Sequence, residues 1–240
     1  MINSNIMKKG LFILTMFLLG LTSVKAQWQV GVTGGRSINT LSTHTHYAYD
    51  LNYDTSWGWA FGIPVTYSFN EWFALRADAM LVQKNYGMDR GGFFRGMGIG
   101  YDVRSEYFSL PVVTQFSFGG KRLRGFINGG GYVGYWLSSH RTEGVMTFMD
   151  WLQNVHRQVY SEKNDFDSRR DNRFDAGVTA GVGMEYILTP RIGITIEARQ
   201  YYGLTNLYKN KIVGEPRYNT TWTFQVGCKY YFKENNNIKK

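Results

Sequence analysis

Six charged residues stand at positions where the sequence alternates between apolar and polar side chains. They comprise three cations and three carboxylates: Arg76, Asp78, Lys84, Glu185, Glu197 and Arg199. Residues two apart in a β-strand share a face, so all six would lie on the face opposite the apolar side chains. Equal numbers of opposite charges suit a paired buried network, because an unpaired buried charge is strongly destabilising. The sequence predicts a lumen charge network, acting either as a gated polar pathway or ligand site or as a structural plug, and we favour the plug.

Histidine and serine residues offer two further kinds of chemistry. His44 and His46 have the spacing that places two metal ligands on one face of a strand, but no acidic or cysteine partner is fixed nearby. Ser138 and His140, with Glu143 close in sequence, contain the residue types of a lipid A deacylase or acyltransferase, but the His-x-Ser order of those enzymes is absent. We therefore predict no metal, no cofactor and no catalytic residue, and hence a protein that is not an enzyme.

The elements that would position these residues are strands, because the hydrophobic period is two along most of the chain. In 55–69 the odd positions carry bulky apolar side chains such as Trp57, Phe61 and Val65, whereas the even positions are small or polar. Eight such segments can be distinguished: 28–32, 55–69, 72–84, 106–116, 125–137, 174–188, 191–199 and 221–232. Several tryptophans lie in these segments or at their ends, as in the aromatic girdles of membrane barrels.

The connections between these segments alternate in length. Short turns are expected at 70–71, 119–124 and 189–190, and long polar loops at 40–54, 87–103, 138–173 and 205–218. This pattern predicts an all-β fold, an eight-stranded antiparallel up-and-down transmembrane β-barrel with long extracellular loops. The rival is a water-soluble barrel with its apolar faces inside, but those faces would overfill so small a lumen.

The N-terminal segment predicts export. Lys8 and Lys9 precede an apolar run too short to span a bilayer, and the run ends in a small-x-small cleavage site at Ala26. We expect a cleaved signal peptide at 1–26, the barrel at 27–232 and a polar tail at 233–240. The formal net charge is +9, yet no Lys/Arg run interleaves with aromatic residues as in a nucleic-acid surface. Lipid of the bacterial outer membrane is the expected partner, and no nucleic acid is expected.

One long loop shows a different period. Within 144–162, Phe148, Leu152, Val155 and Val159 have helical spacing, which predicts a short amphipathic helix in the third outer loop. That helix would cap the barrel mouth or rest on the lipid interface, or it would bind a partner protein through Phe148 and Leu152.

Four segments resemble a known family. The sequence at 107–113 (YFSLPVV), the spaced glycines at 174–186, the stretch 196–206 and the segment 75–87 are similar to the PorT-like outer-membrane barrels of the Bacteroidota. Ser109 departs from the acidic residue that often precedes the Leu-Pro pair in that family. The resemblance implies an accessory or interaction barrel of the cell envelope, with a link to type IX protein secretion through the namesake. We predict such a barrel, monomeric and with envelope or secretion proteins as partners; the alternative is a lipid-modifying enzyme or a narrow conduit for small solutes.

Overall fold

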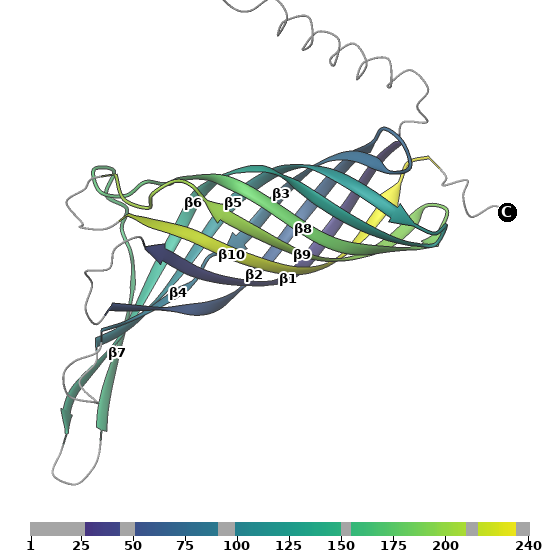
Figure 1. Ribbon diagram of the computed structural model, residues 1–240. Coiled ribbons are helices and arrows are strands. Elements are labelled where there is room, and N and C mark those ends of the chain that lie inside the picture. Colours follow the sequence, from purple (N-terminus) through teal and green to yellow (C-terminus); the bar gives the residue numbers. More distant parts are fainter. Residues whose placement is uncertain (1–26, 44–50, 91–98, 150–154, 210–215, 234–240) are drawn as a thin grey trace, which may run out of the picture.

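The computed structural model describes residues 27–43, 51–90, 99–149, 155–209 and 216–233, and these residues form one antiparallel sheet (Figure 1). The predicted signal peptide, the C-terminal tail beyond Lys233, and the residues His44, His46 and Leu152 lie outside the described residues. The strands are β1 (Gln27–Thr43), β2 (Leu51–Ser68), β3 (Phe73–Gln83), β4 (Tyr86–Arg90), β5 (Ile99–Gly119), β6 (Leu123–Met149), β7 (Val155–Lys163), β8 (Phe174–Thr189), β9 (Ile192–Gly203) and β10 (Arg217–Tyr231).

The sheet closes on itself. β1 pairs with both β2 and β10, and the ring continues through β9, β8, β6, β5 and β3 back to β2. β4 follows β3 after a break at Lys84 and Asn85 and takes the same place between β2 and β5. β7 lies outside the ring. Because β3 and β4 share one position, the barrel has eight strand positions. The predicted eight-stranded antiparallel barrel is confirmed.

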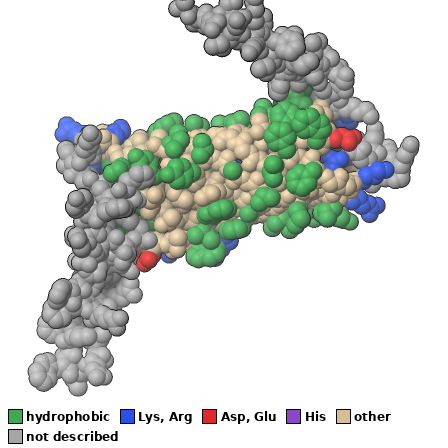
Figure 2. All heavy atoms as spheres, in the orientation of Figure 1, with side chains coloured by type: hydrophobic (Ala, Val, Ile, Leu, Met, Phe, Trp, Pro, Cys, Tyr) green, Lys and Arg blue, Asp and Glu red, His purple; other side chains and the backbone are tan. Residues whose placement is uncertain are grey.

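The two faces of the wall differ as the period of two predicts. Along β9 and β10, buried and exposed residues alternate almost without interruption. Large apolar side chains such as Ile196 and Val226 are exposed on the outside, while Thr195, Arg199 and Gln225 are buried in the lumen. Figure 2 shows hydrophobic side chains spread over the outer wall. Because the polar faces point inward, the soluble-barrel alternative is wrong.

Short turns join the strands at one end of the barrel. The first residue of β1, Gln27, and the last residue of β10, Tyr231, lie at the same end (Figure 1). In the β5–β6 turn, Gly119 has a φ of 123°, and a Cβ at this position would lie 2.9 Å from the Leu123 carbonyl oxygen. This end faces the periplasm in outer-membrane barrels, and the longer connections at the opposite end face outside.

The helix predicted over 144–162 is wrong. β6 continues to Met149 and pairs with β7 in a hairpin, with Gly144 opposite Val159 and Phe148 opposite His156. The hairpin projects beyond the barrel, at the lower left of Figure 1. The pairing of β6 with β8 ends at Tyr135, so the edge of β6 beyond that point has backbone groups that need another partner. β7 supplies that partner, and this non-local ladder overrides the local helical spacing. Among the described residues, no helix has the length and apolar character needed to cross a membrane.

Candidate functional site: the charged lumen

The centre of the lumen holds a closed ring of four charged side chains from β3 and β9. Arg76 donates from Nε to Asp78 Oδ1 and from Nη1 to Glu197 Oε2, each at 2.7 Å. Arg199 donates from Nη1 to Asp78 Oδ2 at 2.7 Å and from Nε to Glu197 Oε1 at 2.8 Å. Asn128 adds a 2.8 Å hydrogen bond to Glu197 Oε1. Both arginines therefore contact both carboxylates, and the ring is electrically neutral.

A second ion pair lies on the extracellular side of this ring. Lys84 Nζ is 2.6 Å from Asp175 Oδ2, and the Tyr132 hydroxyl donates to Asp175 Oδ1 at 3.3 Å. The same ammonium lies 5.0, 4.8 and 5.9 Å from the ring centroids of Tyr107, Tyr132 and Tyr201. Cation–π attraction of this kind strengthens when water is excluded, and Lys84 is only 2% exposed.

A third, looser pair lies toward the periplasmic end. Lys229 Nζ is 3.7 Å from Glu185 Oε1, and the Tyr231 hydroxyl donates to the same oxygen at 2.5 Å. The Lys229 ammonium also lies 5.5 Å from the centroid of the Phe126 ring. Glu185 therefore has a partner in Tyr231 that does not depend on Lys229.

Glycines on the lumen face make room for these large side chains. A Cβ at Gly177 would lie 2.8 Å from the Tyr132 ring, and one at Gly183 would lie 2.4 Å from the Phe126 ring. The spaced glycines of β8 therefore allow aromatic rings of β6 to lie against the wall of the lumen. An eight-stranded barrel has just enough interior for its own side chains, and here the lumen is packed.

Apolar residues fill the extracellular end of the lumen. The cluster comprises Leu41, Tyr86, Val103, Tyr107, Trp136 and Leu207, with Tyr101, Phe166 and Tyr208 packed against it. The Tyr107 and Trp136 rings stack with centroids 5.6 Å apart, and Phe166 meets Trp136 edge-on at 5.0 Å. Phe166 comes from the β7–β8 connection, which therefore folds back over the mouth.

That connection is held in place by one buried carboxylate. Asp171 accepts hydrogen bonds from Arg170 Nε at 2.8 Å and from the Asp167 amide at 2.9 Å, and it forms a β-bridge with Tyr208. The hydrogen bond to Asp171 raises the pKa of the Arg170 guanidinium above its ordinary value. The β7–β8 connection, which contains Asp171, and the β9–β10 connection, which contains Tyr208, therefore meet over the mouth of the barrel.

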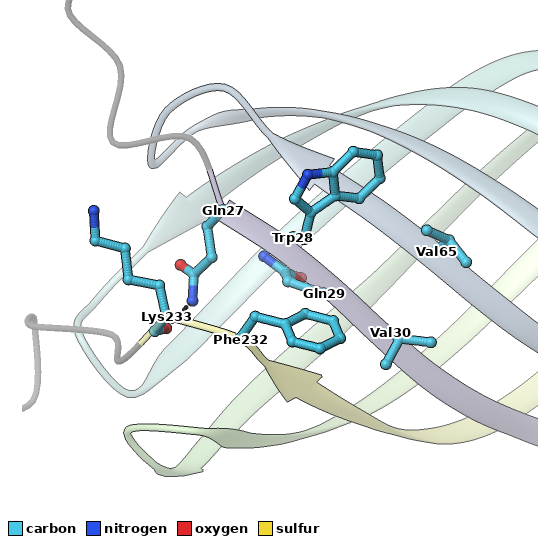
Figure 3. Close-up of a pocket in the computed structure, with 7 residues that line it drawn as sticks. All are labelled: Gln27, Trp28, Gln29, Val30, Val65, Phe232 and Lys233. Carbon is cyan, nitrogen blue, oxygen red and sulfur yellow. Dashed lines mark hydrogen bonds between the residues drawn. The ribbon is translucent and has the colours of Figure 1, made fainter.

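A hollow of about 720 Å³ lies on the outer wall at the periplasmic end rather than in the lumen (Figure 3). Trp28, Val30, Val65 and Phe232 give it an apolar lining, and Lys233 stands at its end. Its apolar lining residues face outward, and the buried Gln29 also contributes to the lining.

Comparison with known proteins gives the family. The family model "Outer membrane protein beta-barrel domain" matches residues 22–209. The chain belongs to this family. Membership places this outer-membrane barrel in the bacterial outer membrane, as predicted. No curated protein matches the chain.

Solved structures similar to this outer-membrane barrel have low sequence identity to it. Ail, the attachment invasion locus protein of Yersinia pestis, is 14% identical, with 85% of this chain and 98% of that chain covered and a TM-score of 0.38. Neisserial surface protein A is 10% identical, with coverages of 86% and 99% and a TM-score of 0.42. OprG from Pseudomonas aeruginosa is 10% identical, with coverages of 85% and 96% and a TM-score of 0.44.

The structure places all six charged residues selected from the sequence in the lumen of this outer-membrane barrel. It brings four of them into one ring, while Lys84 and Glu185 pair elsewhere. Their partners, Asp175 and Lys229, were missed by the sequence reasoning, although both stand at lumen-facing positions of their strands. Apart from Asp171 in the β7–β8 connection, the buried charged side chains among the described residues are therefore four cations and four carboxylates: Arg76, Lys84, Arg199 and Lys229 with Asp78, Asp175, Glu185 and Glu197.

The serine–histidine group does not assemble into a catalytic arrangement in the described residues of the outer-membrane barrel. The Ser138 hydroxyl donates to Glu106 at 3.0 Å, and Ser139 is buried 3.5 Å from the Ser105 hydroxyl. No hydrogen bond joins the exposed His140 to either serine in the part of the chain that the structure describes. Over the same residues, no group of three or more His, Cys, Asp or Glu side chains could hold a metal ion. Ser109, at the position where the family resemblance led us to look for an acid, is buried without a hydrogen-bond partner among the described residues.

Proposed function

We propose that this barrel is a non-enzymatic membrane anchor that presents its β6–β7 hairpin to partner proteins outside the cell. In this role it is an accessory component of the cell envelope, and the PorT-like resemblance favours a protein-secretion machine as its setting. The observation that carries the proposal is the contrast between a packed, neutral lumen and a hairpin that extends beyond the membrane-spanning wall.

The lumen supports a role in stability rather than transport. A hydrated ion would have to displace two arginines that each contact two carboxylates, and then pass Lys84 and its tyrosines. The apolar cluster at the extracellular end offers a polar solute no replacement for its hydration. These features favour an anchor over a conduit.

The hairpin supports a docking role through its backbone. β7 pairs with β6 alone among the described strands, so the outer edge of β7 presents N–H and C=O groups to an incoming strand. An extended segment of a partner can add to such an edge, with main-chain hydrogen bonds providing affinity. Tyr160, Glu162 and Lys163 on β7 are exposed and would contribute side-chain selectivity.

The test uses a variant in which the hairpin is shortened and its register is kept. Replacing residues 145–158 with Asn-Gly joins Gly144 directly to its opposite residue Val159 through a two-residue turn. Tagged wild-type and shortened barrels are purified from gently solubilised outer membranes and compared by quantitative mass spectrometry. We expect envelope or secretion proteins at stoichiometric amounts with the wild type only.

Two controls accompany this test. Heat-modifiable migration on gels shows whether the shortened variant still forms a barrel, and planar-bilayer recordings show whether the wild type conducts. A wild-type barrel that is purified alone, or one whose partners persist on the shortened variant, would overturn the docking role. Steady single-channel conductance would overturn the anchor in favour of the conduit.

A further inference from the structure

Arg36 occupies an unusual place on the outer wall. Its Cα lies opposite Phe224 of β10 and Trp59 of β2, and the side chain is exposed on the lipid-facing side of β1. From the periplasmic end up to the level of Arg36, the other outward side chains described on β1, β2, β9 and β10 are uncharged. An arginine among lipid chains is unfavourable, by an amount that falls toward the membrane interfaces.

Aromatic residues stand beside Arg36 on both neighbouring strands. Trp59 and Phe61 of β2 pack together with centroids 5.4 Å apart, and Trp222 and Phe224 of β10 stack at 6.5 Å. The Phe61 ring covers Gly34, where a Cβ would lie 2.9 Å from its Cδ1 atom. Cross-strand neighbours on one face lie close together, so Arg36 stands between the two aromatic pairs.

No carboxylate among the residues that the structure describes forms an ion pair with Arg36. This sets it apart from the cations of the lumen. The negative charge that neutralises it must come from its surroundings, and those surroundings are lipid. A guanidinium pairs with phosphate through two parallel hydrogen bonds, which suits a phosphorylated headgroup.

The level of Arg36 indicates the leaflet. It is the tenth residue of β1, counted from Gln27 at the periplasmic end. Below it, β1 presents Trp28 and Val32 outward. Above it, β1 presents Ile38, opposite Trp57 and Trp222, and then the polar Thr40 and Ser42. The apolar part suits acyl chains and the polar part suits a sugar headgroup. Arg36 lies one outward residue below the boundary, within reach of it for a long side chain.

We propose that Arg36 binds the phosphate of the phosphorylated glycolipid of the outer leaflet, a lipid A-type molecule. Trp59 and Phe224 stand opposite Arg36 on the neighbouring strands, and the acyl chains lie along the apolar surface below it. This site is independent of the hairpin and of the lumen. It makes the barrel select one lipid at one place on its circumference.

The experiment measures lipid retained by the barrel in native mass spectrometry. Wild type, Arg36→Gln and Arg104→Gln are reconstituted in phosphatidylethanolamine doped with lipid A, then released into detergent. Arg104 is an exposed arginine on β5 and serves as the matched control. Hydrogen bonds to a charged group are worth about a tenfold change in binding, so Arg36→Gln should retain about one-tenth of the wild-type amount of lipid A. Arg104→Gln should retain the wild-type amount.

Two further arms identify the ligand chemistry. Dephosphorylated lipid A tested on the wild type should be retained no better than lipid A is on Arg36→Gln. Phosphatidylglycerol should distinguish wild type from Arg36→Gln by less than twofold. Equal retention of lipid A by the wild type and Arg36→Gln, or an equal loss in Arg104→Gln, would overturn the site. An equally large effect with phosphatidylglycerol would overturn the assignment to the glycolipid.

Discussion

The lumen and the lipid-facing wall of this barrel neutralise charge in opposite ways. In the lumen, each of the four cations forms an ion pair with a carboxylate from the same chain. On the wall, Arg36 stands in an apolar surface without a carboxylate partner among the described residues. Arg36 lies on β1, whereas the lumen charges lie on β3, β8, β9 and β10, with Lys84 directly after β3. Each charge faces its own side because successive side chains of a strand point to opposite faces.

The difference shows which partner each face requires. A lumen charge depends on the protein fold, so its removal should destabilise the barrel in any lipid. The charge of Arg36 depends on the membrane, so its removal should matter only through the lipid composition. A lumen variant should therefore lose the same unfolding free energy in two kinds of bilayer, whereas the effect of an Arg36 variant should differ between them.

The largest effect is expected from Glu197→Gln. This change leaves two arginines facing one carboxylate in the central ring, and removing one partner of a buried ion pair typically costs about 3–5 kcal/mol. We expect the free energy of unfolding to fall by about that amount. Guanidinium unfolding from phosphatidylcholine vesicles, followed by tryptophan fluorescence, measures it.

A double variant tests whether lost charge balance is the cause. Glu197→Gln with Arg199→Met leaves the Arg76–Asp78 pair intact at 2.7 Å and restores equal charge. The double variant should regain at least half of the stability that the single variant loses. If the double variant is less stable than the single one, the individual hydrogen bonds matter more than the balance of charge.

The next effect is expected from Lys84→Met. Asp175 then loses its ammonium partner but keeps hydrogen bonds from Tyr132 and Thr205 at 3.3 and 3.1 Å. We therefore expect a smaller loss of unfolding free energy, about 2–3 kcal/mol, in the same assay. Adding Asp175→Asn should recover part of this loss. A loss as large as that of Glu197→Gln would show that the contacts of Lys84 with the Tyr107, Tyr132 and Tyr201 rings contribute more than the ion pair.

A smaller effect is expected from Lys229→Met. The Nζ–Oε1 separation of 3.7 Å is long for a hydrogen bond, and Glu185 retains the Tyr231 hydroxyl at 2.5 Å. The expected loss is about 1–2 kcal/mol, measured in the same vesicles. Tyr231→Phe is the matched comparison, because it removes the shorter contact; it should be at least as destabilising as Lys229→Met.

The fold was predictable because alternation is a local signal. The stretch 55–69 predicted a strand, and β2 covers Leu51–Ser68. Another local signal, helical spacing, failed at Phe148. It predicted a helix there, but pairing with β7 makes this segment a strand. β6 extends past the end of β8, and its edge needs hydrogen-bond partners whatever the local pattern. Such a requirement depends on the lengths of two distant strands and leaves no local trace.

The charged lumen was predictable in its members but not in its pairs. Parity places Arg76 and Glu197 inside, yet their contact joins residues 121 positions apart and needs the register of the closed ring. Asp175 and Lys229 were not selected from the sequence at all. Both had lumen parity, as the selected Lys84 and Glu185 did, and the selection stopped once its three cations and three carboxylates balanced. A count of every charged residue with lumen parity would have found them.

The smallest effect, and the one that depends on lipid, is expected from Arg36→Leu. In phosphatidylcholine vesicles the arginine has no phosphorylated glycolipid to bind, so leucine should raise the unfolding free energy by up to about 1 kcal/mol, as expected near an interface. In bilayers whose outer leaflet contains lipid A, the wild-type arginine gains its counter-ion and this advantage of leucine should vanish. Arg104→Leu should show no such dependence on lipid. A gain of about 2–4 kcal/mol in phosphatidylcholine would instead place Arg36 near the bilayer midplane, too deep to reach a headgroup phosphate.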